Sequence, residues 1–188
     1  MFTVSVTDSS ALDAFNRLIA LGENPQGALM AIGEKMLEFT RARFVTSTDP
    51  YGNPWAPNAD STLRNALHRP GKRSFTKKGA LSERGVEYLA GKKPLIGESK
   101  SLSTEFSKEI PLVIGDNLVT ISSTMKYAGT QQFGALQGQF GRDKRNHPIP
   151  WGDIPARPFF PDPARGLPPE LQSSISDVLR IAINKAMG

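Results

Sequence analysis

The segment PLVIGDNLVTIS, residues 111–122, decides the fold prediction for this chain of 188 residues. Two short runs of β-branched and apolar residues flank Gly115-Asp116-Asn117, which has the composition of a tight turn. An alternating pattern begins earlier, with Phe106, Ile110, Leu112 and Ile114 on one predicted strand face and Glu105, Ser107 and Glu109 on the other. Because period-two alternation is typical of a half-buried strand, the sequence predicts an antiparallel hairpin over residues 102–123.

Apolar residues at helical spacing lie on both sides of this hairpin. After a short alternating segment over residues 2–6, which predicts a strand, the spacing predicts helices over residues 10–22 and 25–44. At the other end, a strongly amphipathic pattern predicts a helix over residues 169–186. We expect the two longer helices to pack on one face of a sheet that also contains the N-terminal strand or residues 155–160.

These elements predict an α+β fold, in which a small antiparallel β-sheet packs against two or three α-helices, with long loop insertions. The length fits one domain over residues 1–188 with a basic loop or arm at about 58–100. Gly 17 and Pro 15 indicate long irregular segments between the ordered elements. No apolar run is long enough for a membrane span, and the N-terminal residues lack the pattern of a secretion signal, so we expect a cytoplasmic protein without a membrane partner.

The loop over residues 49–57 contains three prolines and a glycine, which exclude regular structure there. Trp55 stands between two prolines in this loop, and we expect its ring to anchor the loop to the edge of the core. The alternative is an exposed Trp that binds sugar or peptide. For Phe133 we likewise expect at least half of the side chain to be buried, near a junction between helix and sheet.

The net charge of +5 is concentrated in one stretch. Between residues 60 and 100 there are ten Lys and Arg residues against four Asp and Glu residues. Such a stretch is typical of an arm that binds nucleic acid, or of a solvated surface that meets an acidic protein. The scarcity of aromatic residues for base stacking favours the second interpretation. The candidate contacts to DNA or to an acidic partner are Lys72, Arg73, Lys77, Lys78, Lys92 and Lys93.

The residues that catalysis requires do not form a recognisable pattern. Cysteine is absent, which excludes disulfides, thiolate metal sites and cysteine nucleophiles. His68 and His147 stand in polar segments without a second ligand at metal-binding spacing. No nucleophile elbow or phosphate-binding loop is present. We therefore expect a protein that is not an enzyme and has no catalytic residues, metal or cofactor.

Four motifs in order resemble the phage virion morphogenesis family, the tail-completion proteins of Mu-like and related tailed phages. They are Arg41-Ala42-Arg43-Phe44 with the loop Asp49-Pro50-Tyr51-Gly52-Asn53-Pro54-Trp55-Ala56-Pro57, then Lys93-Pro94-Leu95-Ile96 with Leu102 and Ser103, then Tyr127-Ala128 with Gln132-Phe133-Gly134, and finally Pro155-Ala156-Arg157-Pro158-Phe159. The resemblance runs from about residue 25 to the C-terminus and is loose over residues 58–92. Glu98-Ser99 stands where the family usually has Thr-Gly, and Gln131 stands where it usually has His.

The resemblance implies a structural virion protein that forms a ring at the head-proximal end of the tail, for tail completion and head–tail joining. It implies a homo-oligomer, with six-fold symmetry favoured over twelve-fold, and partners among the neck, connector and tail-tube proteins. Assembly would take place in the cytoplasm of the bacterial host, and the finished protein would be part of the virion. The alternative function is a nucleic-acid-binding module that uses residues 60–100. The two hypotheses overlap, because a ring at the neck would surround the DNA in its central channel.

A ring protein needs apolar anchors outside its own core and edges that pair with its neighbours. The candidate residues for contacts with other subunits or with neck proteins are Trp55, Leu63, Leu67, Phe75, Arg157, Phe159 and Phe160. We expect residues 60–100 to lie against adjacent subunits or other virion proteins, because so many charges cannot bury enough apolar surface to order the segment alone.

Overall fold

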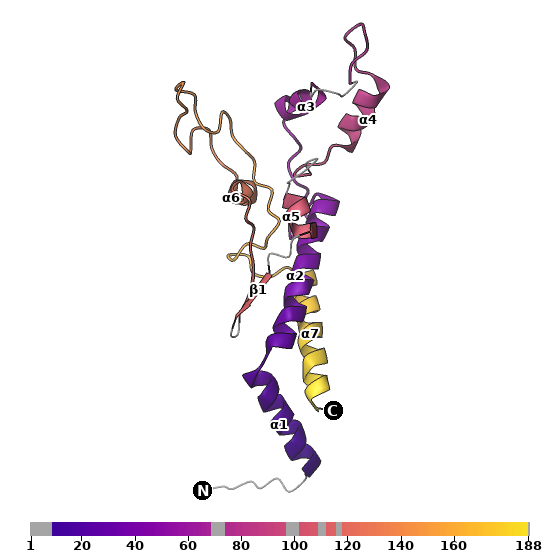
Figure 1. The fold of residues 1–188 in the computed structure, drawn as a ribbon, viewed down its shortest axis with the longest axis vertical. Helices are drawn as coiled ribbons and strands as arrows, with labels where there is room; N and C mark the ends of the chain where they lie inside the picture. Colours follow the sequence, from indigo (N-terminus) through magenta and orange to yellow (C-terminus); the bar gives the residue numbers. More distant parts are fainter. Residues whose placement is uncertain (1–8, 69–73, 97–101, 109–111, 116–117, 188) are drawn as a thin grey trace.

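The computed structural model describes residues 9–68, 74–96, 102–108, 112–115 and 118–187. Its helices and strands, in chain order, are α1 (Ser9–Glu23), α2 (Gln26–Thr46), α3 (Asp60–Leu67), α4 (Glu83–Gly91), α5 (Leu102–Lys108), β1 (Leu112–Gly115), β2 (Leu118–Ile121), α6 (Ala128–Phe133) and α7 (Pro169–Met187). The molecule is elongated, with two segments that project from one end (Figure 1).

Three helices build the lower part of the molecule. α2 and α7 lie side by side and run in opposite directions, and α1 extends below them (Figure 1). α1 also packs against α7, and the Arg17 side chain donates a hydrogen bond of 3.0 Å to the carbonyl oxygen of Met187. The helices predicted over residues 10–22, 25–44 and 169–186 are therefore confirmed to within a few residues.

The core lies near the C-terminal end of α2 and consists mainly of aromatic rings. Phe44 on α2 contacts the rings of Trp55, Phe106 and Phe159, with centroids 5.4, 5.9 and 5.6 Å apart. Phe106 and Phe159 are almost completely buried. Since such rings bury a large apolar area each, this cluster holds together the loop over residues 49–57, α5 and the segment around Phe159.

The predicted hairpin is confirmed only in its second half. β1 and β2 pair antiparallel, with Leu112 opposite Ile121 and Gly115 opposite Leu118. Residues 102–108, in contrast, form α5, so the strand predicted from Leu102 onward is wrong. Leu102 and Phe106 are four residues apart, and on a helix this spacing places both side chains toward the core, where they are fully buried.

The α+β prediction is therefore confirmed in part, because the chain is mainly helical with some strand. β1 and β2 form the only sheet among the residues that the structure describes, and both strands pack against α2. Residues 155–160 do not join this sheet, since the nearest ladder contact is an isolated bridge between Ala135 and Ile154. The strand predicted over residues 2–6 lies outside the described residues.

Candidate assembly surfaces

A buried clamp, formed by Trp55, Gln132 and Arg157, joins the segment around Phe159 to the rest of the core. The indole Nε1 of Trp55 donates a hydrogen bond of 2.8 Å to the carbonyl oxygen of Pro158. The Arg157 guanidinium donates from Nε to the carbonyl of Ala56 at 2.8 Å and from Nη2 to that of Pro57 at 2.7 Å. Burial lowers the pKa of this guanidinium. The expected burial of Trp55 is thus confirmed, with only 6% of its surface exposed.

Gln132, on α6, completes the clamp with its side-chain amide. Its Oε1 accepts hydrogen bonds from the backbone N–H groups of Phe159 and Phe160, at 3.0 and 3.1 Å, and its Nε2 donates to the carbonyl of Phe160 at 2.9 Å. This amide satisfies backbone groups that the proline-bounded segment cannot pair in a sheet. The clamp therefore has a structural role within one subunit.

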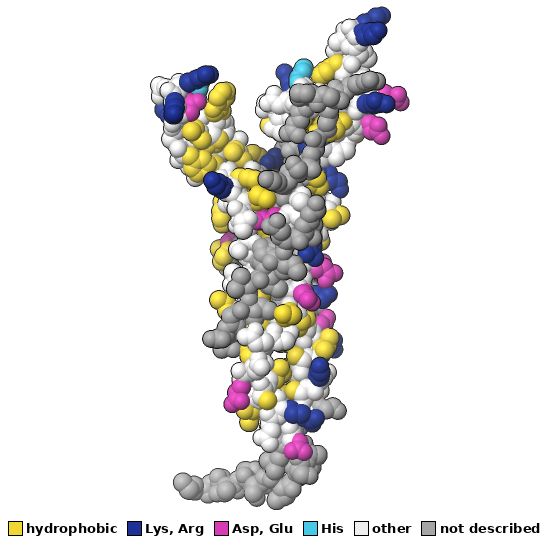
Figure 2. Space-filling model, in the orientation of Figure 1, with side chains coloured by type: hydrophobic (Ala, Val, Ile, Leu, Met, Phe, Trp, Pro, Cys, Tyr) yellow, Lys and Arg dark blue, Asp and Glu magenta, His cyan; other side chains and the backbone are white. Residues whose placement is uncertain are grey.

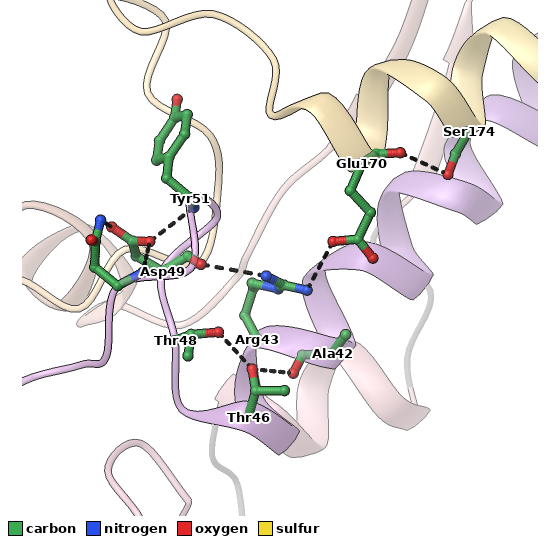
Figure 3. A network of polar contacts seen from close by, with 9 residues as sticks. Ala42, Arg43, Thr46, Thr48, Asp49, Tyr51, Glu170 and Ser174 are labelled. Carbon is green, nitrogen blue, oxygen red and sulfur yellow. Dashed lines mark hydrogen bonds and ion pairs between the residues drawn. The ribbon is translucent and has the colours of Figure 1, made fainter.

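A second polar network fixes the end of α2 to α7 and to the loop (Figure 3). The Arg43 guanidinium bridges the carbonyl oxygen of Asp49 at 3.4 Å and the Glu170 carboxylate at 3.5 Å. Burial alone would raise the pKa of the Asp49 carboxyl. Hydrogen bonds donated by Asn53 and Tyr51 outweigh this effect, so that the pKa is lower than its ordinary value. These contacts explain why a proline-rich loop holds one conformation.

The first projecting segment, here called the helical arm, comprises the described residues 60–68 and 74–96. It contains the helices α3 and α4, where the sequence predicts a basic loop or arm. Gly85 packs so closely against the chain that an added Cβ would lie 2.3 Å from the carbonyl oxygen of Ser74. Ser82 caps α4 by accepting a hydrogen bond from the N–H of Gly85. The arm therefore has its own internal packing and a defined shape.

The second projecting segment, here called the loop arm, comprises residues 134–154. Backbone hydrogen bonds cross it from base to tip, between Ala135 and Ile154 at 3.0 and 2.8 Å and between Phe140 and Ile149 at 2.8 Å. At the tip, Asp143 accepts hydrogen bonds from the backbone N–H groups of Arg145 and His147. Bonds from His147 to this carboxyl lower its pKa. The segment is therefore an ordered, hairpin-like extension.

Large apolar side chains are exposed on and beside the loop arm. Phe133, at the end of α6, is 79% exposed, so its predicted burial is wrong. Leu136 and Trp151 are each 70% exposed, and Phe140 is 54% exposed. Sequence reasoning missed these last three residues, although isolated aromatic residues in a Gly-rich polar segment are a signal that could have identified Phe140 and Trp151.

Both arms carry cations near their tips (Figure 2). Lys77 and Lys78 are exposed at the turn of the helical arm, and their contact with DNA or an acidic partner stays a prediction. Lys92 and Lys93 instead lie at its base and donate hydrogen bonds of 2.7 Å to the carbonyls of Ile96 and Val45. Lys72 and Arg73 lie outside the described residues. On the loop arm, Arg142, Lys144 and Arg145 form a second basic group that the sequence reasoning did not single out.

The predicted interface residues separate into two groups. Four of them are buried within the subunit, namely Trp55, Leu67, Arg157 and Phe159. Leu63 and Phe160 are partly exposed, and Phe75 is exposed with its ring stacked on His68 at 4.8 Å. For these three, contact with another protein stays a prediction.

His147 has a carboxylate partner, contrary to the sequence interpretation, since its Nδ1 lies 3.0 Å from Oδ2 of Asp143. The pair belongs to the turn at the arm's tip. In the described parts of the chain, no three His, Cys, Asp or Glu side chains gather closely enough to hold a metal ion. No described helix is sufficiently long and apolar to cross a membrane.

Comparison with known proteins gives one result. Residues 6–90 match the phage virion morphogenesis family. The resemblance predicted from the sequence motifs is thereby confirmed over residues 6–90, which make up less than half of the chain. No curated protein and no solved structure matches the chain.

The family match differs in extent from the predicted resemblance. It begins before residue 25, and it includes the stretch from 58 to 90, which we expected to match only loosely. The family segment therefore contains α1, α2, the loop with Trp55 and most of the helical arm. The loop arm and the motif around Arg157 lie beyond it, although the buried clamp joins that motif to the loop inside the match.

Proposed function

We propose that this protein is a structural virion component of a tailed phage or prophage that forms a ring at the head-proximal end of the tail and completes head–tail joining. The observation that carries the proposal is the family match over residues 6–90. The shape of the subunit supports it, because two ordered arms project from one end and expose apolar and basic side chains there. Apolar surface outside a core is typical of proteins that function in assemblies.

A ring role also fits the division of the molecule into a small core and extended parts. The aromatic cluster and the buried clamp stabilise the centre of the subunit, whereas both arms lie outside that centre. A monomer gains nothing from exposing Trp151 and Phe133 to water. Neighbouring subunits, or connector and tail-tube proteins, would cover these side chains.

The experiment is to remove the protein from a phage that carries it and to count joined particles, free heads and free tails by electron microscopy. We expect filled heads and full-length tails that do not join, and restoration of joining by the wild-type chain supplied in trans. Normal joining in the absence of the protein would refute the proposal. Averaged images of joined particles would give the symmetry of the ring, for which we expect six-fold.

The second candidate function is DNA binding through the basic arms. The exposed Lys77 and Lys78 favour it, together with the cations at the tip of the loop arm. Binding of the purified chain to random-sequence DNA, measured over a series of salt concentrations, separates the two functions. Steep loss of affinity with salt would support DNA binding, because phosphate neutralisation releases counterions. Weak binding at all salt concentrations would exclude it.

A further inference from the structure

The lower part of the molecule, here called the helical stem, consists of α1, residues 26–36 of α2 and α7. Its helices bury few side chains, since Gly33 and Leu171 are the only buried residues in the described stem segments of α2 and α7. Most of the stability of a helix in a protein comes from packing its apolar face against another element. Apolar side chains of the stem are instead exposed along its length (Figure 2). The subunit alone therefore lacks a layer that covers them.

The three helices of the stem surround an apolar groove with a volume of about 590 Å³. Mostly small side chains from each helix line it, among them Ala20 on α1, Ala28 and Ala31 on α2, and Val178 and Ala182 on α7. The charged side chains of the lining are those of Arg17 and Lys185, and both are cations. Because the lining side chains are small, the groove has room for the apolar side chains of a further helix.

α7 carries a second apolar surface, here called the ridge, which consists of Leu179, Ile183 and Met187. These residues recur at intervals of four, so that their side chains lie along one side of the helix. They are 43%, 43% and 53% exposed. Leu179 and Ile183 each directly follow a residue that lines the groove, and the ridge is therefore turned by about 100° from the groove around α7. The ridge of a subunit cannot fill the groove of the same subunit.

The ridge and the groove match in length and in shape. The ridge extends from residue 179 to residue 187 of α7, which is about 12 Å. The groove extends along α7 from Val178 to Ala186, which is also about 12 Å. Large side chains on the ridge and small side chains in the groove provide the complementary surfaces that helices need to pack closely. Every copy of the chain carries both surfaces.

The chain also exposes more surface than a compact monomer of its size. Its accessible surface is 13284 Å², compared with about 8,800 Å² expected for a compact monomer of 20.4 kDa. When the residues outside the described ranges are counted as unfolded chain, about 1,500 Å² of the excess still remains. Each partner in a standard protein–protein interface buries about 800 Å². The excess therefore corresponds to two interfaces per subunit, which is the number that a ring requires.

We infer that the ridge of one subunit inserts into the groove of a second copy of this chain, where its α7 becomes the fourth helix of a bundle with α1, α2 and α7. This inference rests on the proposed ring function and specifies the contact from which the ring is built.

The contact joins two different surfaces, so a row of subunits still has one unoccupied groove at one end and one unoccupied ridge at the other. Such a heterologous contact closes into a ring when the rotation between subunits permits it. The stem contact leaves both arms uncovered, because they project from the other end of the molecule (Figure 1). They remain accessible to the connector and tail-tube proteins.

Disulfide trapping tests the contact directly, because the chain contains no cysteine. One preparation carries Ile183→Cys on the ridge, and a second, distinguishable by a size tag, carries Ala28→Cys in the groove. The matched control pairs Ala28→Cys with Asn184→Cys, since Asn184 is also exposed and follows Ile183 on α7 but lies about 100° further around the helix. After mixing and mild oxidation, in the purified full-length chain and in complemented phage particles, we expect at least about tenfold more mixed disulfide for the first pair than for the control.

Equal yields from the two pairs, or a higher yield from the control, would overturn the inference, as would absence of the mixed disulfide from both preparations. Protection of Ala28→Cys from a thiol reagent in particles, without the mixed disulfide, would also overturn it. In that case another virion protein would occupy the groove.

A charge placed on the ridge gives a second criterion. Ile183→Lys should weaken self-association in sedimentation experiments by at least about tenfold, because an ammonium group would be buried in an apolar groove whose charged side chains are also cations. Asn184→Lys adds the same charge beside the ridge and should leave self-association within about twofold of wild type. Ala20→Trp, which fills the groove itself, should act like Ile183→Lys. Equal effects of the two Lys variants, or normal association of Ala20→Trp, would contradict the contact.

Failure of this inference and failure of the proposed function give different results. Loss of head–tail joining on removal of the protein, without the disulfide between ridge and groove, would support the function and refute this contact. Formation of that disulfide in a protein that is not needed for joining would support the contact and refute the function.

Discussion

The segment around Phe159 and the loop arm are neighbours in sequence, but they use aromatic residues in opposite ways. Phe159 and Phe160 stand among prolines, and the buried clamp holds their backbone so that Phe159 lies inside the aromatic core. Trp151 and Phe140 stand among glycines and polar residues, on a hairpin that holds them away from the core. The first region stabilises the subunit, and the second exposes surface that a partner can cover.

The largest loss of stability should follow from removing one buried ring from the aromatic core. Phe159→Ala should lower the free energy of unfolding by about 3–5 kcal/mol, because its buried ring contacts Phe44 and Phe106 and leaves a cavity when removed. Urea denaturation followed by circular dichroism measures the loss. A change below about 1 kcal/mol would mean that the site collapses around the gap, and that the core depends less on this ring than its burial indicates.

The next largest loss of stability should follow from a substitution in the buried clamp. Gln132→Ala should cost about 2–3 kcal/mol, since the backbone N–H groups of Phe159 and Phe160 would lose their acceptor. Gln131→Ala is the matched control on the same helix, because the Gln131 side chain makes one long contact of 3.4 Å with Arg157. Equal losses in the two variants, measured in the same urea titration, would show that the clamp does not depend on the Gln132 amide.

Sequence patterns correctly predicted the helices whose apolar periodicity extends over many residues. Helices α2 and α7 each extend over about five to six turns, and at that length a helical period is unambiguous. Residues 102–108 were assigned to a strand because a few alternating residues fit both structures. Leu102 and Phe106 satisfy a helical spacing equally well, and their burial against α2 decides the outcome.

The candidate site was harder to predict, because its partners are distant in sequence. The sequence analysis places Arg157 at an interface together with its neighbours Phe159 and Phe160. The structure buries it on carbonyl oxygens that are 100 and 101 residues away, and nothing local to Arg157 indicates them. Similarly, α6 is only six residues long, too short for its period to show that Gln132 rather than Phe133 faces the core.

A smaller, pH-dependent effect should come from Glu105, which joins α5 to the segment that follows β2. Burial raises the pKa of its carboxyl, but hydrogen bonds donated by Ser123 and Thr124 lower it more, to below the ordinary value of 4.5. The unfolded chain therefore takes up the proton more readily. The stabilisation is present above a pH of about 4.5 and is lost as the pH falls through the folded-state pKa.

Glu105→Gln should cost about 1 kcal/mol at neutral pH, through loss of the charge-assisted hydrogen bonds. The difference between wild type and variant should then shrink as the solution is acidified below pH 4.5. Urea titrations at a series of pH values test this. A difference that grows on acidification would show that the folded-state pKa is raised, and would contradict the role given to Ser123 and Thr124.

The smallest effect on stability is expected at the loop arm, and it tests the comparison most sharply. Trp151→Ala removes a large aromatic side chain, yet it should change the free energy of unfolding by no more than about 0.5 kcal/mol, because the ring is 70% exposed. Trp55→Ala is the matched control, as the same substitution at a buried ring should cost about 3–5 kcal/mol. Trp151→Ala should instead impair head–tail joining, measured by complementation of a phage that lacks the protein.

If Trp151→Ala destabilised the subunit as much as Trp55→Ala, the loop arm would be part of the core. If it left both stability and joining unchanged, the exposed ring would have no role in assembly.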